Sequence, residues 1–124
     1  MKTSKDYRAE ANAVVPRISA EDAIALHGGE TVFVDVRDRG AIAQSGTIAG
    51  AHRIARGMME FVADPDTKFH NPALAKGAKI ALVCGAGGQA ALAGKTLKDM
   101  GYENVVNIGG FGDWKEAGGP TEDG

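Results

Sequence analysis

The sequence has 124 residues, and its 14 Lys and Arg against 16 Asp and Glu give a net charge of −2. This length predicts one domain with a core of its own, and the balanced charge indicates neither a nucleic-acid partner nor contact with an anionic membrane. The one cysteine excludes an internal disulfide and a multi-cysteine zinc site.

The start of the chain is polar, with scattered alanines. We expect residues 1–15 to be a flexible lead-in and residues 16–124 to form the single domain. The N-terminus lacks the apolar region of a secretory signal, and no later apolar run approaches the roughly 18 residues of a membrane span. We therefore expect a protein of the cytoplasm that makes no membrane contact.

Short apolar runs alternate with helical patterns along the domain. Strands are predicted at 17–18, 31–36, the end of 46–54, 79–83 and 104–108. Helices are predicted after Ser19, at 38–44, 57–62 and 90–100, and around Trp114. Strands that alternate with helices favour an α/β fold, with a parallel sheet and helices on both faces.

The cysteine lies where a buried strand meets a glycine-rich loop. Cys84 follows the strand at 79–83, and the helix at 90–100 begins just beyond the loop. Ligand sites in open α/β sheets lie past the carboxyl ends of the strands, and a loop entering a helix turns several N–H groups toward one point. A thiolate in that place would be stabilised and nucleophilic. The position alone fits a buried, inert cysteine equally well.

Other chemistries of this loop have less support. A phosphate-binding loop would end in Lys-Ser or Lys-Thr, and this loop does not. A cysteine-dependent phosphatase needs an Arg six residues after the cysteine to grip phosphate, and that position is Ala90. The three histidines and the cysteine do not have the spacing of metal ligands, so no metal site is expected.

Four short motifs follow one another in a set order over residues 17–120. They are Asp35-Val36-Arg37; 46–51, which reads Gly-Thr-Ile-Ala-Gly-Ala; the strand that ends in Cys84; and 101–120, which holds Gly101-Tyr102, Gly109-Gly110-Phe111, Trp114 and Gly118-Gly119-Pro120. This order resembles that of the single-domain rhodaneses, a family of sulfurtransferases. The resemblance implies a five-stranded parallel sheet with helices on both faces, and no metal or organic cofactor.

The resemblance also implies a reaction. Cys84 would attack the outer sulfur of a donor such as thiosulfate, release sulfite and become a persulfide. The sulfur would then pass to cyanide, a thiol or a partner protein. The residues implied for substrate binding are Gly85, Ala86, Gly87, Gly88, Gln89 and Ala90 of the loop, together with Arg56. For Arg56, a solvated surface charge is an equal alternative.

Most of the notable side chains outside the loop are expected to have structural roles. By analogy with the family, Arg37 is expected to brace the fold through a carboxylate rather than to touch substrate. Phe111 and Trp114 are expected in the core, and His27 and His70 on the surface.

The loop departs from the family pattern Cys-x-x-Gly-x-Arg-Ser, because Gln89 and Ala90 replace the Arg and the Ser. A lost charge-assisted hydrogen bond costs roughly 1.5–3 kcal/mol, or about 10- to 150-fold in binding an anionic donor. Three functions stay open: an active sulfurtransferase, a persulfide carrier or binding module loaded by another protein, and a regulatory domain whose cysteine is inert or senses oxidation. We favour the first, and the sequence does not predict the oligomeric state.

Overall fold

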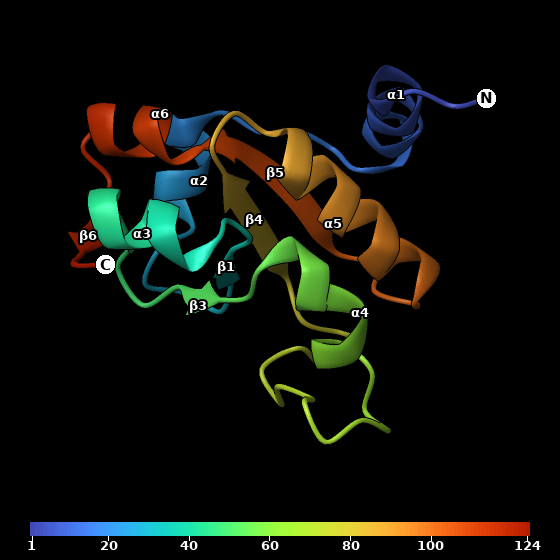
Figure 1. Ribbon diagram of the computed structural model, residues 1–124. Coiled ribbons are helices and arrows are strands. Elements are labelled where there is room, and N and C mark those ends of the chain that lie inside the picture. The colour runs from blue at the N-terminus through green and yellow to red at the C-terminus, as the bar shows by residue number, and fades with distance from the viewer.

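A parallel sheet of four strands forms the centre of the molecule in the computed structural model, which describes all 124 residues (Figure 1). In spatial order the strands are β3 (His52–Arg53), β1 (Val32–Asp35), β4 (Ile80–Cys84) and β5 (Val105–Gly110). β2 (Thr47–Ile48) and β6 (Thr121–Glu122) form a separate antiparallel pair. The α/β class with a parallel sheet is therefore confirmed.

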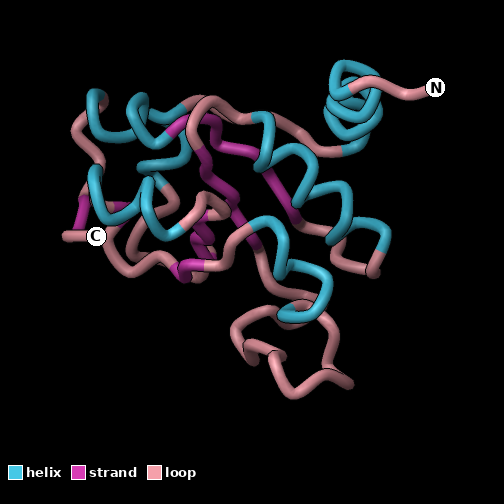
Figure 2. The backbone as a smooth tube through the Cα atoms, viewed as in Figure 1, coloured by secondary structure: helices cyan, strands magenta, loops and turns pink.

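The helices cover both faces of the sheet. In chain order they are α1 (Ser4–Val14), α2 (Ala20–Ala25), α3 (Arg39–Ser45), the 3-10 helix η1 (Arg56–Met58), α4 (Met59–Val62), α5 (Gly88–Asp99) and α6 (Phe111–Glu116). α4 and α5 lie over one face of the sheet and α2 and α6 over the other (Figures 1 and 2). Each pair of helices packs with the strand side chains of its own face. The central strands are buried on both faces, which explains their continuous apolar runs. None of the helices is both long and apolar enough to cross a lipid bilayer.

The sheet has four strands rather than the five that the resemblance implied. The expected edge strand at 17–18 is reduced to a single parallel bridge between Arg17 and Asn107. Here Ile18 N donates to Asn107 O (3.1 Å), and Asn107 N donates to Pro16 O (2.8 Å). Pro16 has no N–H of its own, so it cannot donate to the ladder and the pairing stays short.

The segment expected to be a flexible lead-in contains α1. Its start carries a capping box: Asp6 N donates to Thr3 Oγ1 (3.2 Å), and Thr3 N donates to Asp6 Oδ2 (2.9 Å). Ala11 in the helix and Val15 directly after it are buried, and Val15 packs against Gly94 of α5. The domain boundary at residues 15 and 16 stays a prediction.

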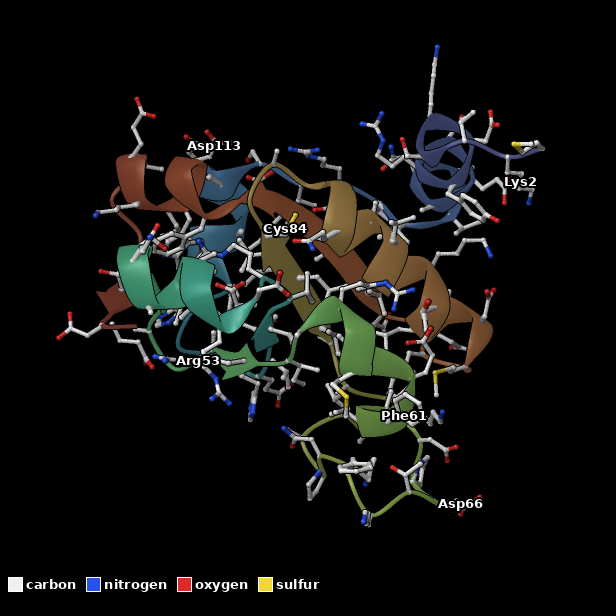
Figure 3. The ribbon with its side chains drawn as sticks, in the orientation of Figure 1. Lys2, Arg53, Phe61, Asp66, Cys84 and Asp113 are labelled. Carbon is white, nitrogen blue, oxygen red and sulfur yellow. The ribbon has the colours of Figure 1, made fainter.

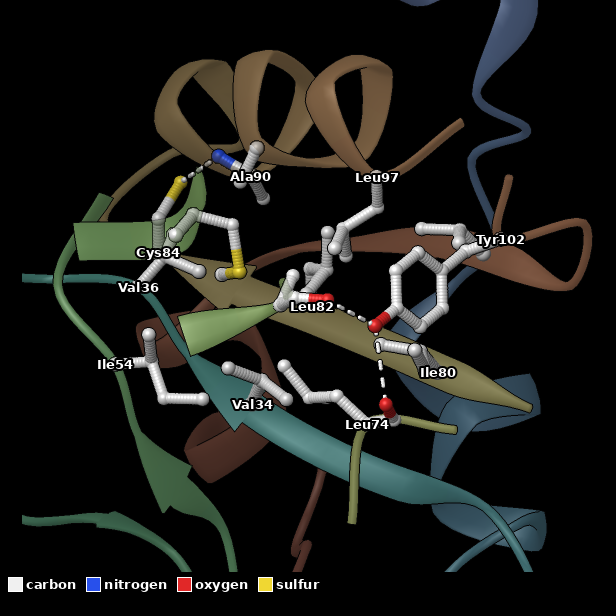
Figure 4. Close-up of a cluster of buried hydrophobic side chains, with 14 residues drawn as sticks. Val34, Val36, Ile54, Leu74, Ile80, Leu82, Cys84, Ala90, Leu97 and Tyr102 are labelled. Atoms are coloured by element: carbon white, nitrogen blue, oxygen red, sulfur yellow. Dashed lines mark hydrogen bonds between the residues drawn. The ribbon is translucent and has the colours of Figure 1, made fainter. Parts of the chain in front are cut away.

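Tyr102 anchors the long loop between α4 and β4, which extends away from the sheet (Figures 2 and 4). Its single O–H is shared between two carbonyl oxygens of the loop, Ala63 O (2.6 Å) and Leu74 O (3.0 Å). Burial of the ring raises the pKa of Tyr102 above its ordinary value.

The aromatic core on the face covered by α2 and α6 agrees only in part with the prediction. Phe111 and Trp114 are buried. His27, expected on the surface, is half-buried beside Phe33 and Trp114, with ring centroids 5.5 and 5.8 Å away. Its Nε2 lies 2.7 Å from Ala49 O, so a polar partner inside the fold holds the imidazole there.

Candidate active site

Cys84 is the last residue of β4, at the carboxyl end of a central strand (Figure 3). Its side chain is 1% exposed and joins the apolar cluster beneath α5. The chain then turns through residues 85–87 into α5. The parallel sheet thus places the thiol where ligand sites of such folds lie.

Two backbone N–H groups point at the sulfur. Gly87 N donates to Cys84 Sγ at 2.9 Å, and Ala90 N donates to it at 3.4 Å, the second being drawn in Figure 4. Gly87 has φ of 106°, a left-handed conformation that favours glycine. N–H donors at the start of a helix stabilise a negative sulfur, so this geometry suits a thiolate.

The other loop residues divide into inner and outer positions. Gly87 and Ala90 are buried beside the sulfur, whereas Gly85, Ala86 and Gln89 are exposed. Gln89 therefore lies in the first turn of α5 with its side chain open to solvent. Substrate contacts by these residues stay a prediction.

Arg56 is held away from the loop by two partners. Its Nη1 donates to Glu60 Oε1 (3.0 Å), and its Nη2 donates to Thr96 Oγ1 in the C-terminal half of α5 (3.0 Å). These contacts tie η1 to α4 and α5. Its role toward substrate also stays a prediction.

The end of β1 holds a buried ionic network next to the cysteine loop. The Arg37 guanidinium donates to Asp35 through Nε and Nη2, the latter at 2.8 Å from Oδ2. Thr47 Oγ1 donates to the same oxygen at 2.7 Å, and Arg37 also donates to Ser45 Oγ and Gly46 O (2.9 Å each). Arg37 therefore braces the fold through a carboxylate, as predicted.

A cavity of about 600 Å³ lies at the same edge of the sheet, between the segments that follow β1 and β3. Its walls include Arg39, Ile54 and Met58, but no residue of the cysteine loop. Nearby, Gly50 N–H and the Arg53 guanidinium donate to the Glu122 carboxylate and hold its pKa below the usual range. Arg53 is thereby engaged with the C-terminal strand.

Two residues that contact the loop were not singled out from the sequence. Arg17 Nη2 donates to Ala86 O (3.4 Å), and Asn107 Nδ2 donates to Gly87 O (2.9 Å). The predicted edge strand at 17–18 was the available signal, because it places Arg17 beside β5.

Comparisons with known proteins agree with this architecture. The rhodanese-like domain family model matches residues 19–117. A protein of unknown function from Rhodopseudomonas palustris, described as a "possible tyrosine phosphatase", is 40% identical, covers 98% of this chain and 96% of its own, and has a TM-score of 0.92. No curated protein matches.

Two further solved structures are similar. The polysulfide-sulfur transferase homodimer from Wolinella succinogenes is 28% identical over 97% of this chain and 87% of its own, with a TM-score of 0.75. A rhodanese-like domain from Anabaena is 26% identical over 87% and 79%, with a TM-score of 0.72. The family match spans most of the sequence and the sheet that carries Cys84, so the chain belongs to the rhodanese-like domain family.

Proposed function

We propose that this protein is a sulfurtransferase that moves sulfane sulfur from a donor to a thiophilic acceptor through a Cys84 persulfide. The observation that carries the proposal is the pair of N–H donors, from Gly87 and Ala90, on the Cys84 sulfur. A family likeness to a sulfur transferase supports it.

The reaction has two steps at one atom. The Cys84 thiolate attacks the outer sulfur of the donor, the donor S–S bond breaks, and the leaving group departs with the electron pair. With thiosulfate that leaving group is sulfite. Cyanide or an acceptor thiolate then attacks the outer sulfur of the persulfide, and Cys84 leaves as a thiolate. The Gly87 and Ala90 N–H groups stabilise that leaving thiolate, so they assist the second step as well.

The loop favours a donor without an oxyanion. Thiosulfate carries a sulfonate end, which a fixed guanidinium would grip, and the neutral Gln89 stands at that place in the loop. A polysulfide or a persulfidated thiol has no such end, so the replacement of the arginine by Gln89 weakens its binding less. The polysulfide-sulfur transferase relative supports the same choice. Thiols as acceptors fit a reducing compartment such as the cytoplasm.

A phosphatase is the second candidate, because the Rhodopseudomonas palustris relative, itself of unknown function, is described as a "possible tyrosine phosphatase". Phosphate transfer to a cysteine needs a guanidinium that grips the phosphate oxygens. Ala90 stands at the required position here and is buried, and its contribution to the sulfur is a backbone N–H. The loop is therefore better suited to sulfur than to phosphate.

The test compares donors on one preparation of the full chain. Thiocyanate formation from cyanide is followed with polysulfide and with thiosulfate, beside hydrolysis of p-nitrophenyl phosphate. We expect turnover with polysulfide, slower turnover with thiosulfate, and neither in Cys84→Ser. Phosphate release that depends on Cys84, without sulfur transfer, would replace the proposal with the phosphatase.

A further inference from the structure

The Arg17 guanidinium lies directly against the cysteine loop. A Cβ at Gly87 would lie 2.9 Å from Arg17 Cζ, and a Cβ at Gly109 would lie 2.7 Å from Arg17 Nη2. Both glycines have a positive φ, 106° and 81°. The side chain therefore fills a space that exists only because neither position carries a Cβ, and any larger residue there would displace it.

The backbone of Arg17 is fixed by its bridge to β5, and its guanidinium is free of carboxylates. Arg17 takes part in none of the five salt bridges of the protein. Its side chain makes one hydrogen bond, from Nη2 to Ala86 O, 3.4 Å away. The positive charge is thus directed at a backbone carbonyl of the loop.

The bonded carbonyl belongs to the peptide that contacts the sulfur. Ala86 O and Gly87 N are the two polar ends of one planar peptide group. Arg17 holds the oxygen end, and the nitrogen end donates to Cys84 Sγ at 2.9 Å. The next peptide is held as well, because the buried Asn107 donates to Gly87 O and accepts from Gly109 N (2.8 Å).

We infer that Arg17 is a positioning residue for the Cys84 thiolate. A guanidinium on the carbonyl keeps the Ala86–Gly87 peptide from turning over, and it polarises the peptide so that its N–H becomes a stronger donor. The fixed positive charge also favours the negative sulfur. Arg17 thereby supplies, from the edge of the sheet, a cation that the loop lacks at Gln89. The inference rests on the proposed function only in treating Cys84 as the reacting group.

Alkylation of Cys84 by iodoacetamide over a pH series tests this directly, because the chain has no other cysteine. The plateau rate at alkaline pH reports access to the thiol, and the pH midpoint reports how well the thiolate is stabilised. In Arg17→Gln we expect a rate near pH 7 that is about two- to tenfold lower, with a raised midpoint and an unchanged plateau. The effect is modest because Arg17 is exposed to solvent.

Two further variants complete the test. Arg17→Lys keeps the charge without the planar fork and should fall between the wild type and Arg17→Gln. Arg8→Gln is the matched control, because Arg8 lies beside Gly88 without a hydrogen bond to the loop, and it should react as the wild type does. Thermal unfolding confirms that each variant is folded.

Equal midpoints in wild type and Arg17→Gln would overturn the inference. An equal effect of Arg8→Gln would overturn it as well, because it would indicate that any nearby positive charge acts on the sulfur. Sulfur transfer by the wild type is measured separately. An Arg17-dependent midpoint in a protein that transfers no sulfur would overturn the proposed function and leave this inference standing.

Discussion

The carboxyl ends of β1 and β4 are neighbours in the sheet, where Asp35 pairs with Val83, yet they are built in opposite ways. At the end of β1, a carboxylate, a guanidinium and a hydroxyl from Asp35, Arg37 and Thr47 satisfy one another in the interior. At the end of β4, the hydrogen-bond partners of the Cys84 sulfur are backbone N–H groups. The charged groups at the end of β1 are paired with one another, whereas the N–H donors at the end of β4 point at the sulfur on which the proposed reaction depends.

The largest effect should come from the sulfur itself. Cys84→Ser keeps the size and the N–H contacts but removes the nucleophile, so sulfur transfer should be lost entirely while the protein stays folded. Thiocyanate assays and thermal unfolding of the purified variant check both halves. Transfer that survives in this variant would remove Cys84 from the mechanism.

The end of β1 should instead control stability. Asp35→Asn leaves the Arg37 guanidinium buried without its carboxylate, and we expect a loss of about 3–5 kcal/mol in the free energy of unfolding. Urea denaturation measures it. Glu60→Gln, which breaks the exposed pair of Arg56 and Glu60, is the control and should cost less than about 1 kcal/mol. If both variants lose a similar free energy of unfolding, the buried network at the end of β1 is no more important for stability than a surface ion pair.

A positive charge placed in the cysteine loop should change how the protein discriminates between donors. Gln89→Arg supplies a charged donor for a sulfonate, so turnover with thiosulfate should rise by up to about 10- to 150-fold while turnover with polysulfide changes little. Gln89→Met, which is uncharged and similar in length, serves as the control. If thiosulfate turnover does not rise, the missing charge is not what limits this loop.

The smallest effect concerns Tyr102, remote from both ends. Tyr102→Phe leaves Ala63 O and Leu74 O without their donor and should cost about 1–2 kcal/mol of stability, with Cys84 alkylation unchanged. Because burial raises the pKa of Tyr102 in the folded state, the wild type should lose stability as the pH rises above 10.0, the ordinary value, while the Phe variant lacks that loss. Denaturation at several alkaline pH values measures the difference. Parallel curves would show that the phenol is not held neutral.

The sequence was sufficient for elements with a strong local pattern. The β-branched run of β1 and the apolar stripe of α5 predicted a buried strand and a helix, and Cys84 was placed correctly between strand and loop. α1 was missed because only Ala11 within it is buried, which leaves almost no apolar stripe to detect. A capping signal existed at Thr3 and Asp6 but had no hydrophobic pattern beside it.

The two side chains that hold the cysteine loop, Arg17 and Asn107, could not be predicted from local sequence patterns. The Arg17 contact joins residues 69 positions apart, and the Asn107 contact joins residues 20 apart. Neither side chain carries a sequence motif that indicates a partner. His27 was misplaced for the same reason, since its aromatic neighbours and Ala49 come from other elements.

Intact-protein mass spectrometry after incubation with polysulfide, and separately with thiosulfate, tests the central claim most directly. If Cys84 forms a persulfide, the wild type gains the mass of one sulfur atom, which cyanide removes and which is absent from Cys84→Ser. No gain with either donor, or a gain that persists in Cys84→Ser, would contradict persulfide chemistry at the end of β4.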